Sequence, residues 1–323
     1  MQYRALGNTG LRVSEIGHGL WGMGDWSGST DRGSADALST SLALGCNVYD
    51  SAAAYGAGKS DALLGGLVQA HPSERIVTAG KVPPKNWTWP ATKSEPFAEV
   101  FPYDYVMACA RDSRAKMNVE QIDLIQLHVW DDAWASDPTF ERVARGLKAS
   151  GVARSFGLSL NRWEPWNGLA AIRTGLVDAV QVIYNIFDQA PEDELFPMCI
   201  ERNAGVIARV PLDEGSLGGT LTLATTFPPD DWRSSYFGPK NLAPTVARVE
   251  ALKKIVPTSM TLPELALRFI LEHPAVSTII VGMRSPQNIR RNAAVSDGTP
   301  LDPALVAQLR LHRWDRKPAP WSD

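Results

Sequence analysis

Residues 122–158 read IDLIQLHVWDDAWASDPTFERVARGLKASGVARSFGL. An apolar run at 122–127 is followed by an amphipathic segment at 138–149 and then by a second apolar run at 155–158. Short apolar runs between turn residues are typical of buried strands, and an intervening segment with helical periodicity predicts a helix. Parallel strands need such a crossover between them. The stretch therefore predicts one strand–helix–strand unit with parallel strands.

The same alternation runs along most of the chain. Further strands are expected at 15–19, 47–50, 76–79, 179–184, 206–210 and 277–281. Further helices are expected at 34–44, 60–69, 103–117, 163–173, 192–202, 263–272, 286–295 and 303–311. Eight strands that alternate with helices predict an α/β fold, namely a closed (β/α)8 TIM barrel, with an open doubly wound sheet as the alternative. The sequence has no linker or low-complexity tract, so residues 1–323 are expected to form a single barrel domain.

Three segments stand outside the alternation. Strand-like residues 3–6 and 11–13 flank the turn Gly-Asn-Thr-Gly at 7–10, which predicts an N-terminal β-hairpin that caps the floor of the barrel. A long loop after the seventh strand, at 212–244, is rich in Gly, Pro, Ser and Thr and is expected to act as a lid or cofactor clamp. Another long connection, at 82–102, follows the third strand.

Composition excludes several classes of function. The net charge is −3, which argues against a nucleic-acid binder with a strongly basic face. No apolar run approaches the roughly 18 residues of a membrane-spanning helix, and the first residues lack the apolar core of a signal peptide. The three cysteines are far apart in the sequence. We therefore expect a cytoplasmic protein without disulfides or a membrane partner.

Ionisable residues occur at the ends of three consecutive strands. The second strand ends at Asp50, the third at Lys81 and the fourth at His128, and Tyr55 lies in the loop after the second. Each alone has an ordinary structural explanation, such as helix capping or emergence into solvent. Active sites of (β/α)8 barrels, however, lie at the carboxyl ends of the strands. We therefore expect these four side chains to form one catalytic site.

These four residue types suit reduction of a carbonyl group. The carbonyl oxygen needs a proton, and a phenol such as Tyr55, with an ordinary pKa of about 10, is a weak acid at neutral pH. A neighbouring Lys81 ammonium is expected to lower that pKa, and Asp50 would keep the ammonium charged. His128 would orient the substrate oxygen. A metal site is not expected, because only one of the five histidines falls at a strand end and no HExxH motif occurs.

Longer strings around these residues resemble the aldo-keto reductase superfamily, in its bacterial form. The strings are LGNTGLRVSEIG at 6–17, DSAAAYG at 50–56, DLIQLH at 123–128, QVIYN at 181–185 and GMRSPQNIRRN at 282–292. The resemblance implies an NAD(P)H-dependent oxidoreductase that acts on a small-molecule carbonyl or alcohol, such as an aldehyde or ketone with a sugar-like or natural-product skeleton. It assigns catalysis to Asp50, Tyr55, Lys81 and His128, with Tyr55 as general acid and base.

The resemblance also implies where the cofactor binds. Ser159 and Gln181 would hold the nicotinamide carboxamide, and Arg284 would bind the adenosine 2′-phosphate, which favours NADPH, with NADH as the alternative. The remaining implied contacts are Arg209, Pro211, Leu212, Gly215, Leu217, Gly282, Asn288 and Asn292. Three positions depart from the family pattern: Leu160 replaces an asparagine, Arg209 replaces an aromatic residue that stacks on the nicotinamide, and Arg291 replaces an acidic residue.

Tryptophans near the expected rim suggest a substrate pocket lined by Trp21, Trp87, Trp89 and Trp130. The GHGLWG segment at 17–22 fits the GxGxxG dinucleotide motif by spacing, but further glycines follow it and no helix is expected there. Two other functions stay open at this point. One is a barrel lyase or isomerase that forms a Schiff base on Lys81. The other is a non-catalytic, cofactor-sensing barrel subunit of a larger assembly.

Overall fold

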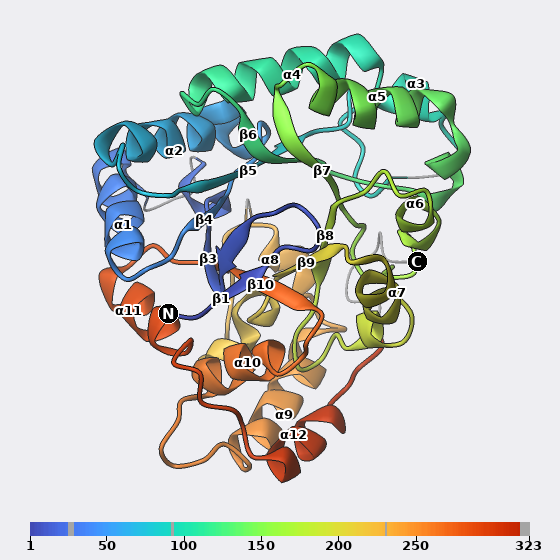
Figure 1. Ribbon diagram of the computed structural model, residues 1–323. Coiled ribbons are helices and arrows are strands. Elements are labelled where there is room, and N and C mark those ends of the chain that lie inside the picture. Colours follow the sequence, from blue (N-terminus) through green and yellow to red (C-terminus); the bar gives the residue numbers. More distant parts are fainter. Residues whose placement is uncertain (25–28, 92–93, 230, 317–323) are drawn as a thin grey trace.

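The computed structural model contains a closed barrel of eight strands, and the structure describes residues 1–24, 29–91, 94–229 and 231–316. All eight neighbouring pairs of strands are parallel, including the pair β10–β3 that closes the barrel (Figure 1). The strands are β3 (Ile16–Gly19), β4 (Val48–Asp50), β5 (Val77–Val82), β6 (Ile122–Leu127), β7 (Ala153–Ser159), β8 (Ala179–Ile183), β9 (Gly205–Arg209) and β10 (Val276–Gly282). The predicted barrel is confirmed, and the open sheet is wrong.

An N-terminal antiparallel hairpin, β1 (Tyr3–Ala5) and β2 (Arg12–Ser14), closes the floor of the barrel, as predicted. Leu6, Leu11 and Val13 are buried in one apolar cluster with residues from the strands, among them Val48 and Leu124. The turn needs a glycine at Gly7, because φ is +52° there and an added Cβ would lie 2.3 Å from the backbone nitrogen of Gly205. Side chains of the hairpin thus cover the floor of the barrel.

Helices surround the barrel (Figure 1). They are α1 (Asp31–Ala43), α2 (Lys59–Ala70), α3 (Phe97–Val100), α4 (Tyr103–Lys116), α5 (Pro138–Ala149), α6 (Leu169–Arg173), α7 (Leu195–Arg202), α8 (Arg233–Tyr236), α9 (Leu242–Lys253), α10 (Leu262–Leu271), α11 (Pro286–Ala294) and α12 (Pro303–Arg310). Five of these helices, α1, α5, α10, α11 and α12, begin at a residue whose side chain accepts a hydrogen bond from a backbone N–H of the first turn. At α5 the Asp137 side chain accepts from the backbone N–H of Thr139. No helix in the described ranges is long and apolar enough to cross a bilayer.

One helical expectation was wrong. The helix expected at 163–173 is limited to α6, because Trp163 adopts a positive φ of 57° and Pro165 and Gly168 follow it. The long loop expected after the seventh strand, at 212–244, is present as the connection between β9 and α9. It contains a 3-10 segment, η5 (Asp213–Gly218), and the one-turn helix α8, and α9 begins inside its expected range. Pro244 reads as a loop residue in the sequence, yet it occupies the first turn of α9, where a missing N–H costs nothing.

Candidate active site

The four predicted catalytic residues lie at one rim of the barrel. Asp50 is the last residue of β4, Lys81 precedes the end of β5, and His128 directly follows β6. The backbone N–H of His128 donates to the carbonyl oxygen of Val82 at 2.9 Å, which continues the β5–β6 pairing up to the site. Tyr55 opens a short 3-10 segment, η2 (Tyr55–Gly58). The parallel register therefore brings residues far apart in the sequence to a common end.

The Lys81 ammonium is at the centre of the cluster. Its Nζ donates to Asp50 Oδ2 at 2.6 Å, to the Ser51 carbonyl oxygen at 2.9 Å and to the Tyr55 hydroxyl oxygen at 3.3 Å. Three acceptors match the three protons of an ammonium group, so this fully buried charge is satisfied. Burial by itself lowers the pKa of Lys81, but Asp50 and Tyr55 outweigh it and the pKa is raised. Lys81 is therefore a fixed positive charge.

The pKa of Tyr55 is raised, contrary to the expectation that Lys81 brings it below the ordinary value. Burial is the largest cause, Lys81 opposes it, and Asp50 adds to the increase. The phenol is thus protonated at neutral pH, as a proton donor must be. Lys81 limits the cost of losing that proton, because it stands beside the oxygen on which negative charge would form.

His128 is a neutral imidazole at this site. Burial, followed by the positive charges of Lys81 and Arg209, lowers the pKa of His128 well below its ordinary value. Its ring packs edge-on against Tyr55, with 5.6 Å between the ring centroids. Within the described chain, Nδ1 of His128 is buried and has no hydrogen-bond partner. A buried polar atom without a partner is costly, so this nitrogen is suited to contact a ligand.

Two glutamines hold the other oxygen of the Asp50 carboxylate. Gln181 Nε2 donates to Asp50 Oδ1 at 3.0 Å, and Gln126 Nε2 lies 3.5 Å from the same oxygen. Gln181 was singled out in the sequence, whereas Gln126 was missed. The period-two alternation of β6 places Gln126 on the same face as His128, and this signal could have identified it.

The predicted tryptophans divide into two groups. Trp89 packs edge-on against His128 at a centroid distance of 5.8 Å, and Trp87 contacts Trp89. Trp21 opens a 3-10 segment, η1 (Trp21–Met23), that packs against η2. These three side chains are 41–61% exposed and can reach a substrate. Trp130 does not line a pocket, so that prediction was wrong: its side chain is fully buried among Phe97, Trp134 and Phe140.

A family model described as "Aldo/keto reductase family" matches residues 15–313. The chain belongs to this family. A pyridoxal 4-dehydrogenase from Microbacterium luteolum is 28% identical over 330 residues, covering 90% of this chain and 91% of its own. An NADH-specific methylglyoxal reductase from Escherichia coli strain K12 is 27% identical over 313 residues, covering 90% of this chain and 91% of its own.

Among solved structures, the holo form of an aldo-keto reductase from Bacillus halodurans has a TM-score of 0.77. Its sequence is 24% identical, and the match covers 98% of this chain and 97% of the other. That likeness supports the barrel fold. The family carries out NAD(P)H-dependent carbonyl reduction, and the identity of these relatives does not fix a substrate for this aldo/keto reductase.

The loop after β9 in this aldo/keto reductase is held in an unusual conformation. Val210, Asp213 and Glu214 have positive φ values of 54°, 45° and 54°. Pro211 is buried beside them, Leu212 is half-buried and Gly215 is exposed. The Leu217 side chain is fully buried in the core, so only its backbone remains for a ligand. Such backbone persists only when its surroundings hold it in place.

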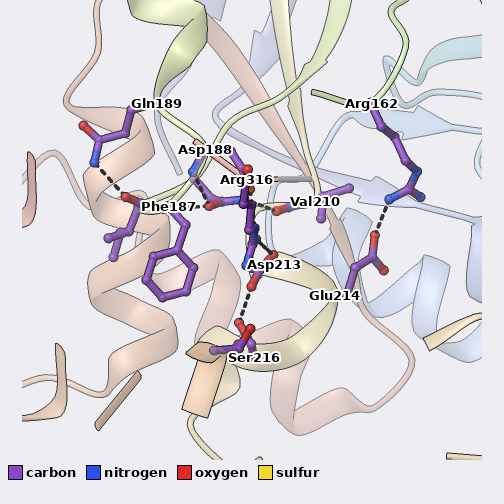
Figure 2. A network of polar contacts seen from close by, with 12 residues as sticks. Arg162, Phe187, Asp188, Gln189, Val210, Asp213, Glu214, Ser216 and Arg316 are labelled. Carbon is purple, nitrogen blue, oxygen red and sulfur yellow. Dashed lines mark hydrogen bonds and ion pairs between the residues drawn. The ribbon is translucent and has the colours of Figure 1, made fainter. Parts of the chain in front are cut away.

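A buried polar network anchors this loop (Figure 2). Asp213 pairs with Arg316 from the C-terminal segment and accepts hydrogen bonds from Ser216 and Tyr236, each at 2.5 Å. Arg316 also lies 3.4 Å from Asp188. On the other side of the loop, Arg162 Nη1 donates to Glu214 at 3.0 Å. Sequence reasoning missed Arg162, Glu214 and Arg316, because their partners lie in distant segments.

Two glycines that follow or end β9 and β10, Gly215 and Gly282, have open space beside them. These strands are neighbours, and a Cβ added to Gly215 or Gly282 would meet nothing within 4 Å. Arg284 is exposed beyond β10, and α11 begins two residues later, with Ser285 capping it by accepting from the N–H of Asn288. Asn288 is exposed and Asn292 is buried. Open space at these two glycines, together with the guanidinium of Arg284 and the N-terminus of α11, fits a phosphate-bearing ligand such as NAD(P)H.

The three residues that depart from the family pattern differ in burial and in contacts. Leu160 is buried in the core, outside the barrel. The next residue, Asn161, is hydrogen-bonded to the backbone of Ala91, in the connection after β5, and to Glu164. Arg209 ends β9, and its Nη2 donates to the Leu160 carbonyl oxygen at 3.0 Å. Ser159 is buried beside Gln181 in the β7–β8 register. Arg291 is exposed.

Proposed function

We propose that this chain reduces the carbonyl group of an aldehyde or ketone with NADPH, and that Tyr55 is the proton donor. The observation that carries the proposal is the position of Lys81 Nζ, which contacts both Asp50 Oδ2 at 2.6 Å and the Tyr55 hydroxyl at 3.3 Å. A cation fixed by an acid beside a protonated phenol is the arrangement that hydride addition to a carbonyl requires, because the oxygen gains negative charge as the carbon accepts hydride.

Each side chain then has one task. The bound cofactor supplies the hydride. Tyr55 donates its proton to the carbonyl oxygen, and Lys81 stabilises the phenolate that remains. Asp50 holds Lys81 in its charged form, and Gln181 fixes the second oxygen of that carboxylate. His128, kept neutral by its surroundings, orients the substrate oxygen through an imidazole N–H.

The raised pKa of Lys81 argues against a Schiff-base lyase or isomerase. An amine attacks a carbonyl in its neutral form, and enzymes that use lysine in this way lower its pKa. Here the ammonium is satisfied by three acceptors and its pKa is raised. A lysine held in this form supports proton transfer by Tyr55.

NADPH is the proposed cofactor because Arg284 is exposed beside the N-terminus of α11. A guanidinium can make bidentate contacts with a 2′-phosphate, which NADH lacks. NADH is the alternative, since the relative from Escherichia coli is NADH-specific. Trp21, Trp87 and Trp89 give the substrate end an aromatic rim, which favours substrates with flat apolar or sugar-like faces.

The test is turnover of a panel of aldehydes and ketones with NADPH and NADH, for the native chain and the Tyr55→Phe variant. We expect NADPH consumption by the native chain and its loss in the variant. Cofactor binding without consumption across the panel would instead favour a cofactor-sensing subunit. Equal activity in both proteins would show that Tyr55 is not the acid.

A further inference from the structure

Arg209 places a guanidinium group across the mouth of the barrel. It is the last residue of β9, yet its Nη2 donates to the carbonyl oxygen of Leu160, which directly follows β7. Strand β8 lies between β7 and β9. The side chain therefore spans the end of β8, the strand that carries Gln181, and Gln181 itself is bonded to Asp50. Arg209 thus belongs to the rim that carries the reacting groups.

Arg209 also differs from the two other cations at this rim. Lys81 pairs with Asp50 at 2.6 Å, and Arg162 pairs with Glu214 at 3.0 Å. Arg209 forms no ion pair with any residue that the structure describes, and its buried Nε finds no hydrogen-bond partner among them. Of these three cations, Arg209 is therefore the one that has no carboxylate partner in the part of the chain that the structure describes.

This charge acts on the reacting groups. Burial lowers the pKa of Arg209 to about 10, the nearby Arg162 adds to this effect, and the Tyr55 phenol and the carboxylates of Glu214 and Asp50 oppose it. The guanidinium thus stays charged at neutral pH. The charges of Arg209 and of the Tyr55 phenol affect each other's pKa, so the two groups lie in the same part of the rim.

Hydride transfer requires the nicotinamide ring to lie close to Tyr55, and therefore within range of the Arg209 charge. The carbonyl oxygen must lie within hydrogen-bond reach of Tyr55, and its carbon within about 3–3.5 Å of the ring carbon that donates hydride. A cation that interacts with the Tyr55 hydroxyl therefore interacts with that ring as well. The ring is neutral when reduced and carries a positive charge when oxidised, so only the oxidised form is repelled.

We propose that Arg209 makes the site discriminate between the two redox states of its cofactor, binding the reduced nicotinamide more tightly than the oxidised one. The inference rests on the proposed function, because it requires a nicotinamide beside Tyr55. At separations of about 5–10 Å and an effective dielectric of about 20, one charge changes a binding constant by roughly ten- to a few hundredfold. The same repulsion opposes hydride donation on the enzyme and speeds release of the spent cofactor.

The experiment measures Kd for NADPH and for NADP⁺ by quenching of tryptophan fluorescence. The proteins are the native chain, two charge-removing variants, Arg209→Gln and Arg209→Met, the charge-keeping Arg209→Lys, and Arg284→Gln as a matched control. We expect the ratio of the NADP⁺ Kd to the NADPH Kd to be well above one in the native chain. It should fall at least about tenfold in Arg209→Gln and Arg209→Met and stay high in Arg209→Lys. Arg284→Gln should weaken both forms alike, because both carry the 2′-phosphate.

A native ratio at or below one overturns the inference without any variant. It is equally overturned if the ratio stays within about twofold of native in a folded Arg209→Gln or Arg209→Met protein. Either result leaves the proposed function intact as long as both forms bind and turnover depends on Tyr55. If the native chain binds neither form, the proposed function fails and the inference fails with it.

Discussion

Lys81 Nζ lies 3.3 Å from the Tyr55 hydroxyl oxygen and 5.0 Å from the centroid of the Tyr55 ring. The ammonium is therefore close to the atom that becomes negative when the phenol gives up its proton. Because Lys81 is also fixed by Asp50, this distance is set by the β4–β5 register and by the turn that carries Tyr55. The backbone of these strands and of this turn therefore determines how strongly Lys81 can stabilise the Tyr55 phenolate.

Removal of the Tyr55 hydroxyl should abolish turnover and leave the cofactor site in place. In Tyr55→Phe we expect kcat to fall by about 10²–10⁴-fold, the range attributed to positioned proton transfer. The Kd for NADPH should change less than about threefold. Tyr3→Phe is the matched control. Tyr3 lies in the hairpin at the opposite end of the barrel, and the substitution removes an exposed hydroxyl that donates to the Gly45 carbonyl oxygen. Turnover by Tyr55→Phe near the native rate would contradict the assignment.

Removal of Lys81 should cost stability as well as activity. Lys81→Met leaves the buried Asp50 carboxylate without its cation, and losing one partner of a buried ion pair typically destabilises a protein by about 3–5 kcal/mol. The double variant Asp50→Asn with Lys81→Met should recover part of that loss, because no charge is then left unpaired. Urea unfolding of the two single variants and the double variant measures the coupling. A double variant less stable than Lys81→Met would contradict this account.

The pH dependence follows from the direction of the Tyr55 shift. Reduction needs the protonated phenol, and a raised pKa keeps the phenol protonated to higher pH. We therefore expect kcat/KM for reduction to be flat through the neutral range and to fall only above the ordinary phenol pKa of about 10. His128 should add no step between pH 6 and 7, since its pKa is well below the ordinary value. A decline centred near neutral pH would show that another group controls the reaction.

Arg284 should decide between the two cofactors. Arg284→Gln removes the proposed contact with the 2′-phosphate, and we expect the Kd for NADPH to rise by about tenfold or more, as for loss of a charge-assisted contact. The Kd for NADH should be nearly unchanged, since NADH has no phosphate at that position. Calorimetric titration with both cofactors measures the difference. Equal weakening of both would place Arg284 elsewhere along the cofactor.

Arg316 should stabilise the loop after β9. Arg316→Met leaves Asp213 and Asp188 buried without their cation, which should cost about 3–5 kcal/mol and weaken NADPH binding. Arg313→Met is the control from the same segment, because Arg313 pairs with Asp193 and Asp315 at the surface and such pairs contribute about 0.2–1 kcal/mol. Thermal unfolding and NADPH titration compare the two. Similar losses in both variants would show that the segment as a whole, and not the buried charge, matters.

Residues at the rim were predictable from the sequence because each lies at or just after the end of a short apolar run, and the carboxyl ends of parallel strands share one end of a barrel. Asp50, Lys81 and His128 follow from that rule, and the parallel pairing brings them together. Trp130 does not follow it: the strand has ended three residues earlier, and its side chain packs into an aromatic cluster with Phe140.

Contacts between loops had no comparable signal. Arg162 and Glu214 are 52 residues apart, and neither segment has a repeating pattern that points to the other. The Arg316 contacts depend on the path of the C-terminal segment, which no local propensity determines. Helix α9 was missed for a different reason, since Pro244 and the preceding Gly and Pro residues outweighed the apolar spacing that follows.

The ion pair between Asp213 and Arg316 also affects how the chain folds during synthesis on the ribosome. Asp213 emerges 103 residues before the arginine that neutralises it. During that interval the carboxylates of Asp188 and Asp213 lack Arg316, the cation with which both pair in the described structure, and full burial of these charges is unfavourable. In a nascent chain halted before residue 316, the segment after β9 should therefore stay exposed to solvent and be cleaved by a protease. We expect this even though all eight strands have been translated by then.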